Sequence, residues 1–139
     1  MRTRLTAPLV PMSLACLLAG TIVFPAAAAE LSTQKSSDRG VTVAVTPQDL
    51  SAGAKSWDFK IVLDTHSVEL DDDLVKTATL LDEKGTRHAP VKWDGAAPGG
   101  HHREGTLRFE PISPQPKSVE LRIQRPGEPK PRVFIWRIK

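Results

Sequence analysis

Short runs in which apolar and polar residues alternate are the feature that most constrains the fold of this chain. In the clearest run, over residues 56–64, the apolar residues on one side are Trp57, Phe59, Ile61 and Leu63. A helix would scatter these side chains around its circumference, whereas a strand places all of them on one face. The pattern therefore predicts a β-strand with one buried face.

Comparable runs recur along the chain, with turn residues between them about every 8 to 15 residues. They predict strands over residues 41–46, 77–82, 87–93, 106–110, 118–124 and 132–138. Around the predicted strand at residues 77–82, a short helix is the alternative. It would begin at Leu74, after a capping aspartate. The predicted fold class is all-β, an immunoglobulin-like β-sandwich of about seven short strands without a disulfide.

The first 29 residues have the pattern of a cleaved signal peptide, with a charged start, an apolar middle and small residues at the end. Arg2 and Arg4 are the charges, and four alanines precede Glu30, where we expect cleavage. Pro11 and Pro25 disfavour a retained membrane-spanning helix. Lipidation at Cys16 is an alternative, although the apolar run continues past it. We therefore expect a periplasmic or secreted protein without a stable transmembrane segment after cleavage.

Cleavage would change the chemistry available to the mature chain. Cys16 is the only cysteine, and both methionines also precede residue 30. The mature chain would therefore contain no disulfide, no thiolate nucleophile and no sulfur ligand for a metal. The formal net charge of +3 would fall by the two charges of Arg2 and Arg4. This removes the electrostatic argument for nucleic acid as a partner.

The mature chain divides into two parts by composition. Residues 30–40 are polar and offer almost nothing to bury, so we expect a disordered leader there. Residues 41–139 carry the alternating runs and form the predicted β-sandwich domain. A mature chain of about 110 residues is long enough for one hydrophobic core and too short for two comfortable domains.

Two short stretches contain three of the four histidines. The first is Asp-Thr-His-Ser at residues 64–67, at the end of the clearest strand, and the second is Gly-Gly-His-His-Arg at residues 99–103. Loops at one end of a sandwich converge, and histidine with aspartate suits Zn²⁺ or Cu²⁺. The candidate metal ligands are therefore Asp64, His66, His101 and His102. The alternative is structural: His66 would form a hydrogen bond at a strand end, and the histidine pair would order its loop.

Patterns typical of other chemistry do not match the sequence. The acidic run at residues 71–73 lacks the spacing of an EF-hand calcium loop, so we expect an exposed acidic loop, with a calcium site between loops as the alternative. The sequence contains no Gly-x-Ser-x-Gly elbow, no His-Glu-x-x-His motif and no phosphate-binding glycine loop. Ser67 beside His66 does not make a triad, because adjacent side chains rarely face each other. We therefore expect no enzymatic activity.

The first histidine stretch, together with the run Gly99-Gly100-His101-His102-Arg103-x-Gly105-x-Leu107-x-Phe109, resembles a group of small exported β-domains of unestablished function. The resemblance extends over residues 41–138. It implies that the two histidine-bearing stretches belong to one recurring unit. It supplies no activity, cofactor or catalytic residue.

These observations favour a small exported, non-enzymatic binding or interaction module without a cofactor. We expect another exported or envelope protein as its partner. Pro90 places its run at a sheet edge because proline lacks the N–H that a central strand donates, and such an edge suits strand addition by a partner. The alternative is a periplasmic Zn- or Cu-binding protein that uses the clustered histidines.

Overall fold

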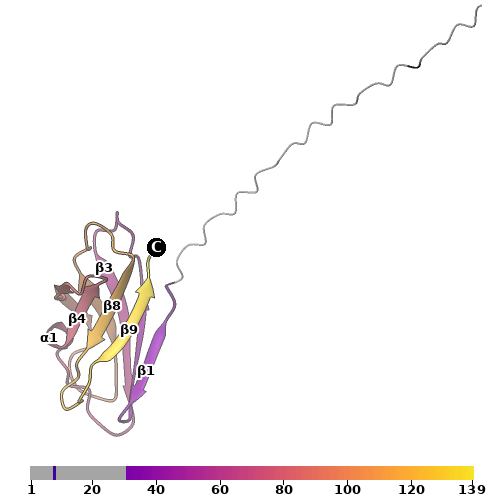
Figure 1. Ribbon diagram of the computed structural model, residues 1–139. Coiled ribbons are helices and arrows are strands. Elements are labelled where there is room, and N and C mark those ends of the chain that lie inside the picture. Colours follow the sequence, from indigo (N-terminus) through magenta and orange to yellow (C-terminus); the bar gives the residue numbers. More distant parts are fainter. Residues whose placement is uncertain (1–7, 9–30) are drawn as a thin grey trace, which may run out of the picture.

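The computed structural model describes residues 8 and 31–139, which form nine β-strands and one short helix (Figure 1). The elements are β1 (Gln34–Asp38), β2 (Val41–Pro47), β3 (Trp57–Thr65), α1 (Leu74–Thr77), β4 (Ala78–Asp82), β5 (Arg87–His88), β6 (Lys92–Gly95), β7 (His102–Phe109), β8 (Ser118–Ile123) and β9 (Arg132–Arg137). Apart from residue 8, the expected signal peptide, with Cys16, lies outside the described residues. Within the described part, no helix has the length and apolar character needed to cross a membrane.

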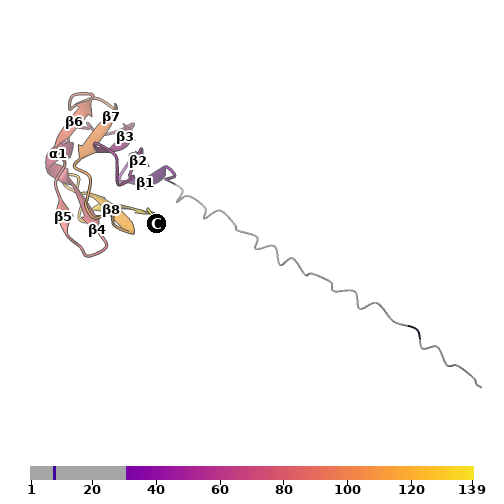
Figure 2. The ribbon, with the colours of Figure 1, turned by 90° about the horizontal axis from the view of Figure 1, so that it is seen from above.

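Two antiparallel sheets pack face to face, as the view from above shows (Figure 2). The first sheet has the strand order β1-β2-β3-β7-β6, and the second has the order β5-β4-β8-β9. This arrangement confirms the all-β class predicted from the alternating runs. Since the described residues contain no cysteine, the sheets are joined by core packing and not by a disulfide.

The apolar faces predicted from the sequence meet between the sheets. The four predicted side chains of β3 are all 0% exposed, and Phe59 is one of them. Its ring centroid is 5.6 Å from that of Phe109 in β7 and 5.6 Å from that of Trp136 in β9. Phe59 therefore contacts a neighbouring strand of its own sheet and a strand of the opposite sheet, and it contributes directly to holding the two together.

Residues 34–38 form strand β1, where the sequence predicted a disordered leader. The strand pairs with β2 through the turn Arg39-Gly40, in which both residues have the positive φ (48° and 75°) that a two-residue hairpin of this kind requires. Polar contacts fix β1: its Ser37 hydroxyl lies 2.8 Å from the hydroxyl of Thr42 in β2. The prediction was wrong because it counted only apolar residues as a reason for order.

Three other segments also differ from the prediction. Buried Pro90 divides the run at residues 87–93 into β5 and β6, which are edge strands of different sheets. The edge position is confirmed, but the chain changes sheet at the proline, which cannot continue the ladder.

Before β4, the Asp73 carboxylate accepts a hydrogen bond from the Val75 N–H and caps one helical turn, so the helix and the strand considered for this region are both present. Strand β7 also begins earlier than predicted, at His102.

Gly95 and Gly105 lie opposite each other in β6 and β7, beside the ring of Trp93. A Cβ on Gly105 would lie 2.6 Å from the Gly95 Cα and 2.7 Å from the Trp93 ring. We therefore expect Gly105→Ala to lower the free energy of unfolding by about 1–3 kcal/mol, the usual cost of overpacking. Gly53→Ala is the matched control, because a Cβ there meets nothing within 4 Å. Urea denaturation measures both variants, and equal stability of the two would contradict this close packing.

Candidate functional site

The pairing of β3 with β7 brings the two histidine-bearing stretches together. Asp64 lies opposite His102 in the strand register, and both side chains are exposed on the outer face of the first sheet. The His102 Nδ1 lies 2.5 Å from the Asp64 Oδ1, and the His102 Nε2 lies 3.7 Å from the Glu104 Oε2. Glu104 is in turn paired with the Lys60 Nζ at 2.7 Å. The result is a row of alternating charges across neighbouring strands.

These carboxylates raise the pKa of His102. The main cause is the hydrogen bond to Asp64, followed by the charge of that carboxylate, and Glu104 adds a smaller effect. The pKa of Glu104 is lowered, chiefly by its hydrogen bond with Lys60. The outer face of the first sheet therefore favours the protonated form of His102.

We expect Asp64→Asn to bring the pKa of His102 down toward the ordinary value of about 6.5. Because the folded-state pKa is raised, the stability from this pair is full below the unfolded-state pKa and is lost as pH rises through the folded-state pKa. The free energy of unfolding should therefore fall more on His102→Gln substitution near about pH 5 than near about pH 9. An NMR titration of the His102 ring measures the pKa, with Asp94→Asn as a control that leaves it unchanged. A His102 pKa that is insensitive to Asp64→Asn would contradict the assignment.

The other predicted ligands, His66 and His101, are exposed and do not join this row. The backbone carbonyl of His101 accepts a hydrogen bond from the Thr65 N–H at 2.9 Å. The Thr65 hydroxyl oxygen accepts from the N–H groups of the two residues after His66, which turns the chain at that point. In residues 8 and 31–139, no group of three or more His, Cys, Asp or Glu side chains is placed to hold a metal ion. The structure thus joins only Asp64 and His102 among the four candidates.

Arg103 is the buried side chain of the Gly-Gly-His-His-Arg stretch at residues 99–103. It is only 1% exposed, and its Nη1 donates to the carbonyl oxygens of Leu70 at 3.0 Å and Asp72 at 2.8 Å. Its Nη2 donates to the carbonyl of Ala96 at 3.3 Å, and its guanidinium lies 5.7 Å from the centroid of the Trp93 ring. This stretch therefore fastens the loop before α1 onto the first sheet. The sequence pattern alone did not predict this role for Arg103.

A chain of four buried charged side chains, here called the buried ion chain, was also not predicted. Its members are Asp72, Arg125, Glu128 and Arg132, with side-chain exposures of 0%, 8%, 3% and 4%. Arg125 donates to both carboxylate oxygens of Asp72, at 2.7 and 2.9 Å, and to Glu128 Oε1 at 3.1 Å. Arg132 donates to both oxygens of Glu128, at 2.8 and 2.6 Å. Each charge has an opposite partner, which offsets the cost of removing it from water.

The buried ion chain connects three segments that are far apart in the sequence: the loop before α1, residues 125–132 and, through Arg132, the hairpin of β1 and β2. Asp72 belongs to the loop before α1, Arg125 and Glu128 to the connection between β8 and β9, and Arg132 to the start of β9. Arg132 also holds the hairpin of β1 and β2 by donating to the carbonyls of Ser36, Asp38 and Val41. The prediction of an exposed acidic loop at residues 71–73 is therefore wrong for Asp72, which is 1% exposed. Its burial is possible because Arg125 neutralises it.

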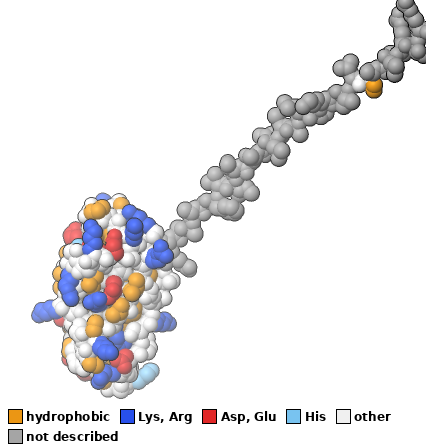
Figure 3. All heavy atoms as spheres, in the orientation of Figure 1, with side chains coloured by type: hydrophobic (Ala, Val, Ile, Leu, Met, Phe, Trp, Pro, Cys, Tyr) orange, Lys and Arg blue, Asp and Glu red, His pale blue; other side chains and the backbone are white. Residues whose placement is uncertain are grey.

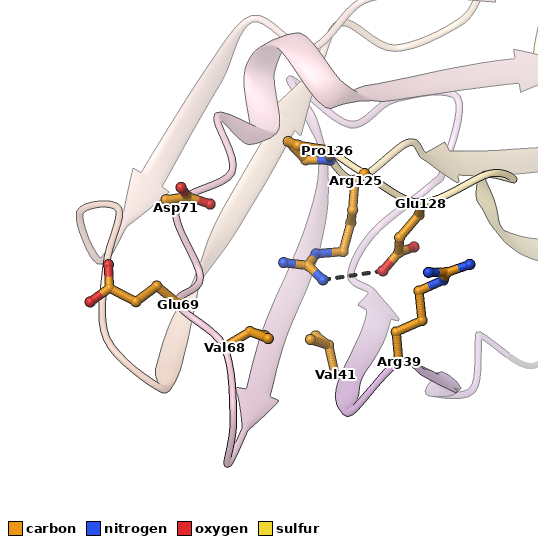
Figure 4. A pocket seen from close by; sticks show the side chains of 9 residues that line it. Arg39, Val41, Val68, Glu69, Asp71, Arg125, Pro126 and Glu128 are labelled. Carbon is orange, nitrogen blue, oxygen red and sulfur yellow. Dashed lines mark hydrogen bonds and ion pairs between the residues drawn. The ribbon is translucent and has the colours of Figure 1, made fainter.

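A cavity of about 210 Å³ lies beside the buried ion chain (Figure 4). Its apolar lining residues are Val41, Val68 and Pro126, and its charged lining includes Arg125 and Glu128. Glu69 also lines the cavity, but Figure 4 shows its carboxylate pointing away from the Arg125–Glu128 pair. Since Arg125 and Glu128 already bind each other, we assign no ligand site to this cavity.

The outer face of the second sheet carries exposed aliphatic side chains. Val133 and Ile135 of β9 are 46% and 53% exposed, because the alternation that buries Phe134 and Trp136 turns them outward. Their cross-strand neighbours in β8 are charged. We call the set Arg87, Glu120, Arg122, Val133, Ile135 and Arg137 the arginine–aliphatic face. Figure 3 shows apolar side chains lying among Lys and Arg side chains on this side of the molecule.

The two outer faces differ in how their charges are paired. The ion pairs of the first sheet include Asp58–Arg108, Lys60–Glu104 and Asp64–His102. On the arginine–aliphatic face, Glu120 pairs with Arg122, while no ion pair among the described residues involves Arg87 or Arg137. This face therefore combines positive charge that lacks a counter-ion with exposed aliphatic surface, as contact surfaces often do.

Comparisons of the chain with protein-family models, with curated proteins and with solved structures found no match.

Proposed function

We propose that this chain is an exported, non-enzymatic binding module that holds a protein partner on the arginine–aliphatic face. The observation that carries the proposal is the exposure of Val133 and Ile135 on the same sheet face as Arg87 and Arg137, which have no carboxylate partner within the described residues. A partner that covers the two aliphatic side chains gains about 25 cal/mol for each Å² of apolar surface removed from water. A partner that supplies carboxylates also neutralises the arginines.

Two further observations support the wider description. Antiparallel sheets of five and four strands support an immunoglobulin-like β-sandwich, the architecture of many modules that bind other proteins. The charged start, apolar middle and alanine-rich end of residues 1–29 support export to the periplasm or the medium. The partner is then another exported or envelope protein.

Substitution of the two exposed aliphatic residues tests this function. We expect the exported protein, treated with a bifunctional cross-linker in the cells that produce it, to form a discrete adduct with a partner. The Val133→Ser/Ile135→Ser variant should lose most of this adduct, because serine removes the apolar contact without disturbing the core. Val91→Ser is the matched control, since Val91 is also exposed (52%) but lies outside the face. An adduct of unchanged yield in the double variant would contradict the proposed function, and so would substrate turnover that is lost on His66→Ala.

A second candidate function is transition-metal binding by His66, His101, His102 and Asp64. It is favoured by the contact of Asp64 with His102 and by the Thr65–His101 backbone hydrogen bond, which hold the two stretches side by side. Zn²⁺ or Cu²⁺ would require a third donor to move toward the Asp64–His102 pair. Calorimetric titration with each ion tests this function against a His66→Ala/His101→Ala/His102→Ala variant. One-to-one binding that the variant lacks would support it, and no binding by the wild type would exclude it.

A further inference from the structure

We propose that the partner on the arginine–aliphatic face is an acidic protein surface that also carries small aliphatic side chains. This inference rests on the proposed function and adds the chemistry of the partner. Three of the charged residues of the face are arginines, and the single glutamate, Glu120, already pairs with Arg122. The face therefore offers unneutralised positive charge, which an acidic partner complements.

The positions of the arginines define where the acidic groups of the partner must lie. Arg87 of β5 and Ile135 of β9 stand at opposite ends of one cross-strand row, which runs through Leu81 and Glu120. Arg137 follows Ile135 on the same side of β9. A partner surface with one carboxylate at Arg87, across the sheet from Ile135, and another at Arg137, next to Ile135 on β9, would meet both arginines while its aliphatic side chains cover Val133 and Ile135. Guanidinium groups suit this role because they bind carboxylates through two parallel hydrogen bonds.

A second copy of this chain does not fit the face. In a symmetric dimer, each copy presents the same surface to the other. Such a dimer would bring the arginines of one face toward those of the other, with one already paired glutamate on each side to offset them. The repulsion between like charges favours a different protein over self-association.

A partner strand that pairs with the edge of β9 does not fit the structure either, because the side chain of Gln34 occupies that edge at Ile135. The side-chain amide of Gln34 donates to the Ile135 carbonyl, and the Ile135 N–H donates to the Gln34 Oε1 at 3.1 Å. Gln34 thus takes both backbone groups that an added strand would need at this residue. The partner must lie across the face of the sheet. This mode differs from the strand addition expected near Pro90.

A membrane surface is the remaining alternative for a basic, partly apolar face. Membrane-binding faces use long or aromatic apolar side chains that reach the acyl region of the bilayer. The exposed large apolar residues of the described chain are valines and one isoleucine, with no aromatic residue among them. These short side chains suit close packing against protein.

Three probes distinguish these alternatives: the octapeptide (Glu-Val)₄, the octapeptide (Lys-Val)₄ and phosphatidylglycerol vesicles. We expect the purified exported protein to bind (Glu-Val)₄ and not (Lys-Val)₄. The affinity for (Glu-Val)₄ should fall at least about tenfold between about 20 and 200 mM salt, because the exposed charges are screened. Failure to bind (Glu-Val)₄ would overturn the inference. Tighter binding to the vesicles than to (Glu-Val)₄, dependent on the same arginines, would also overturn it and assign the face to a membrane.

Substitution of Arg87 and Arg137 tests whether (Glu-Val)₄ binds at the arginine–aliphatic face. Arg87→Gln/Arg137→Gln should weaken (Glu-Val)₄ binding at least about tenfold, because both unpaired charges of the face are removed. Lys35→Gln/Lys55→Gln is the matched control, since it removes the same charge from exposed positions outside the face and should leave the affinity unchanged. Equal weakening in the two variants would overturn the inference, since any basic surface would then serve. A cross-linked adduct that depends on Val133 and Ile135 but not on Arg87 and Arg137 would overturn this inference alone and leave the proposed function standing.

Discussion

The Glu128→Ala variant should unfold at a much lower urea concentration than the wild-type protein, with a free energy of unfolding lower by about 3–5 kcal/mol. Glu128 is the shared partner of Arg125 and Arg132, whose side chains are only 8% and 4% exposed. Alanine would leave both arginines buried without that carboxylate, and a buried charge without its partner is costly. The contacts that close the end of the sandwich near the β1–β2 hairpin would weaken together. Equilibrium urea denaturation near neutral pH measures the loss.

Glu110→Ala is the control for this variant, because Glu110 is exposed and belongs to no ion pair among the described residues. The pH dependence supplies a second check. Arg132, and to a smaller extent Arg125, lower the pKa of Glu128, so its contribution is present above the unfolded-state pKa and is lost as pH falls through the folded-state pKa. The difference in free energy of unfolding between the wild type and Glu128→Ala should therefore become smaller below about pH 4. A loss of less than about 1 kcal/mol near neutral pH would show that the buried ion chain does not hold the three segments together.

The Phe59→Ala variant should lose a comparable amount, about 3–5 kcal/mol of unfolding free energy. Phe59 is 0% exposed and contacts aromatic rings in both sheets, so truncation removes apolar contacts and leaves a cavity at the centre of the core. No disulfide compensates for the loss within the described residues. Thermal or urea unfolding measures this effect.

Val91→Ala is the matched aliphatic control for Phe59→Ala, because Val91 is 52% exposed and its truncation creates no cavity. We expect it to change the free energy of unfolding by less than about 0.5 kcal/mol. If Phe59→Ala were as stable as Val91→Ala, the contacts of Phe59 with the rings of both sheets would not stabilise the fold as argued.

The alternating runs of the sequence predicted the strands that are held in place by burial of an apolar face. The run that contains Phe59 alternates regularly, and its apolar residues are buried as predicted. Strand β1 was missed because hydroxyl pairs and the amide of Gln34 hold it in place of an apolar face. The division of the run at Pro90 could not be read from alternation, since apolar residues continue on both sides of the proline. Such features depend on which strands are neighbours in space, and one sequence does not give that information.

For the candidate site, the sequence predicted that the two histidine-bearing stretches would meet, and the register places Asp64 opposite His102. It did not predict the role of Arg103, because a buried arginine needs carbonyl acceptors that only the folded loops supply. Asp72 was misread as exposed for the same reason, since its partner Arg125 lies far along the chain. The exposed side of β9, in contrast, follows directly from alternation. Surfaces set by strand period were therefore predictable, while contacts between distant polar side chains were not.

Photo-cross-linking from single positions is the most direct test of the binding-module account. A photoreactive residue at position 135 lies within the arginine–aliphatic face, whereas one at position 44 lies on the outer face of the first sheet. We expect a discrete adduct with an exported partner from position 135 and none from position 44, in cells that export the full chain. No adduct from position 135, or adducts of equal yield from both positions, would contradict the binding-module account.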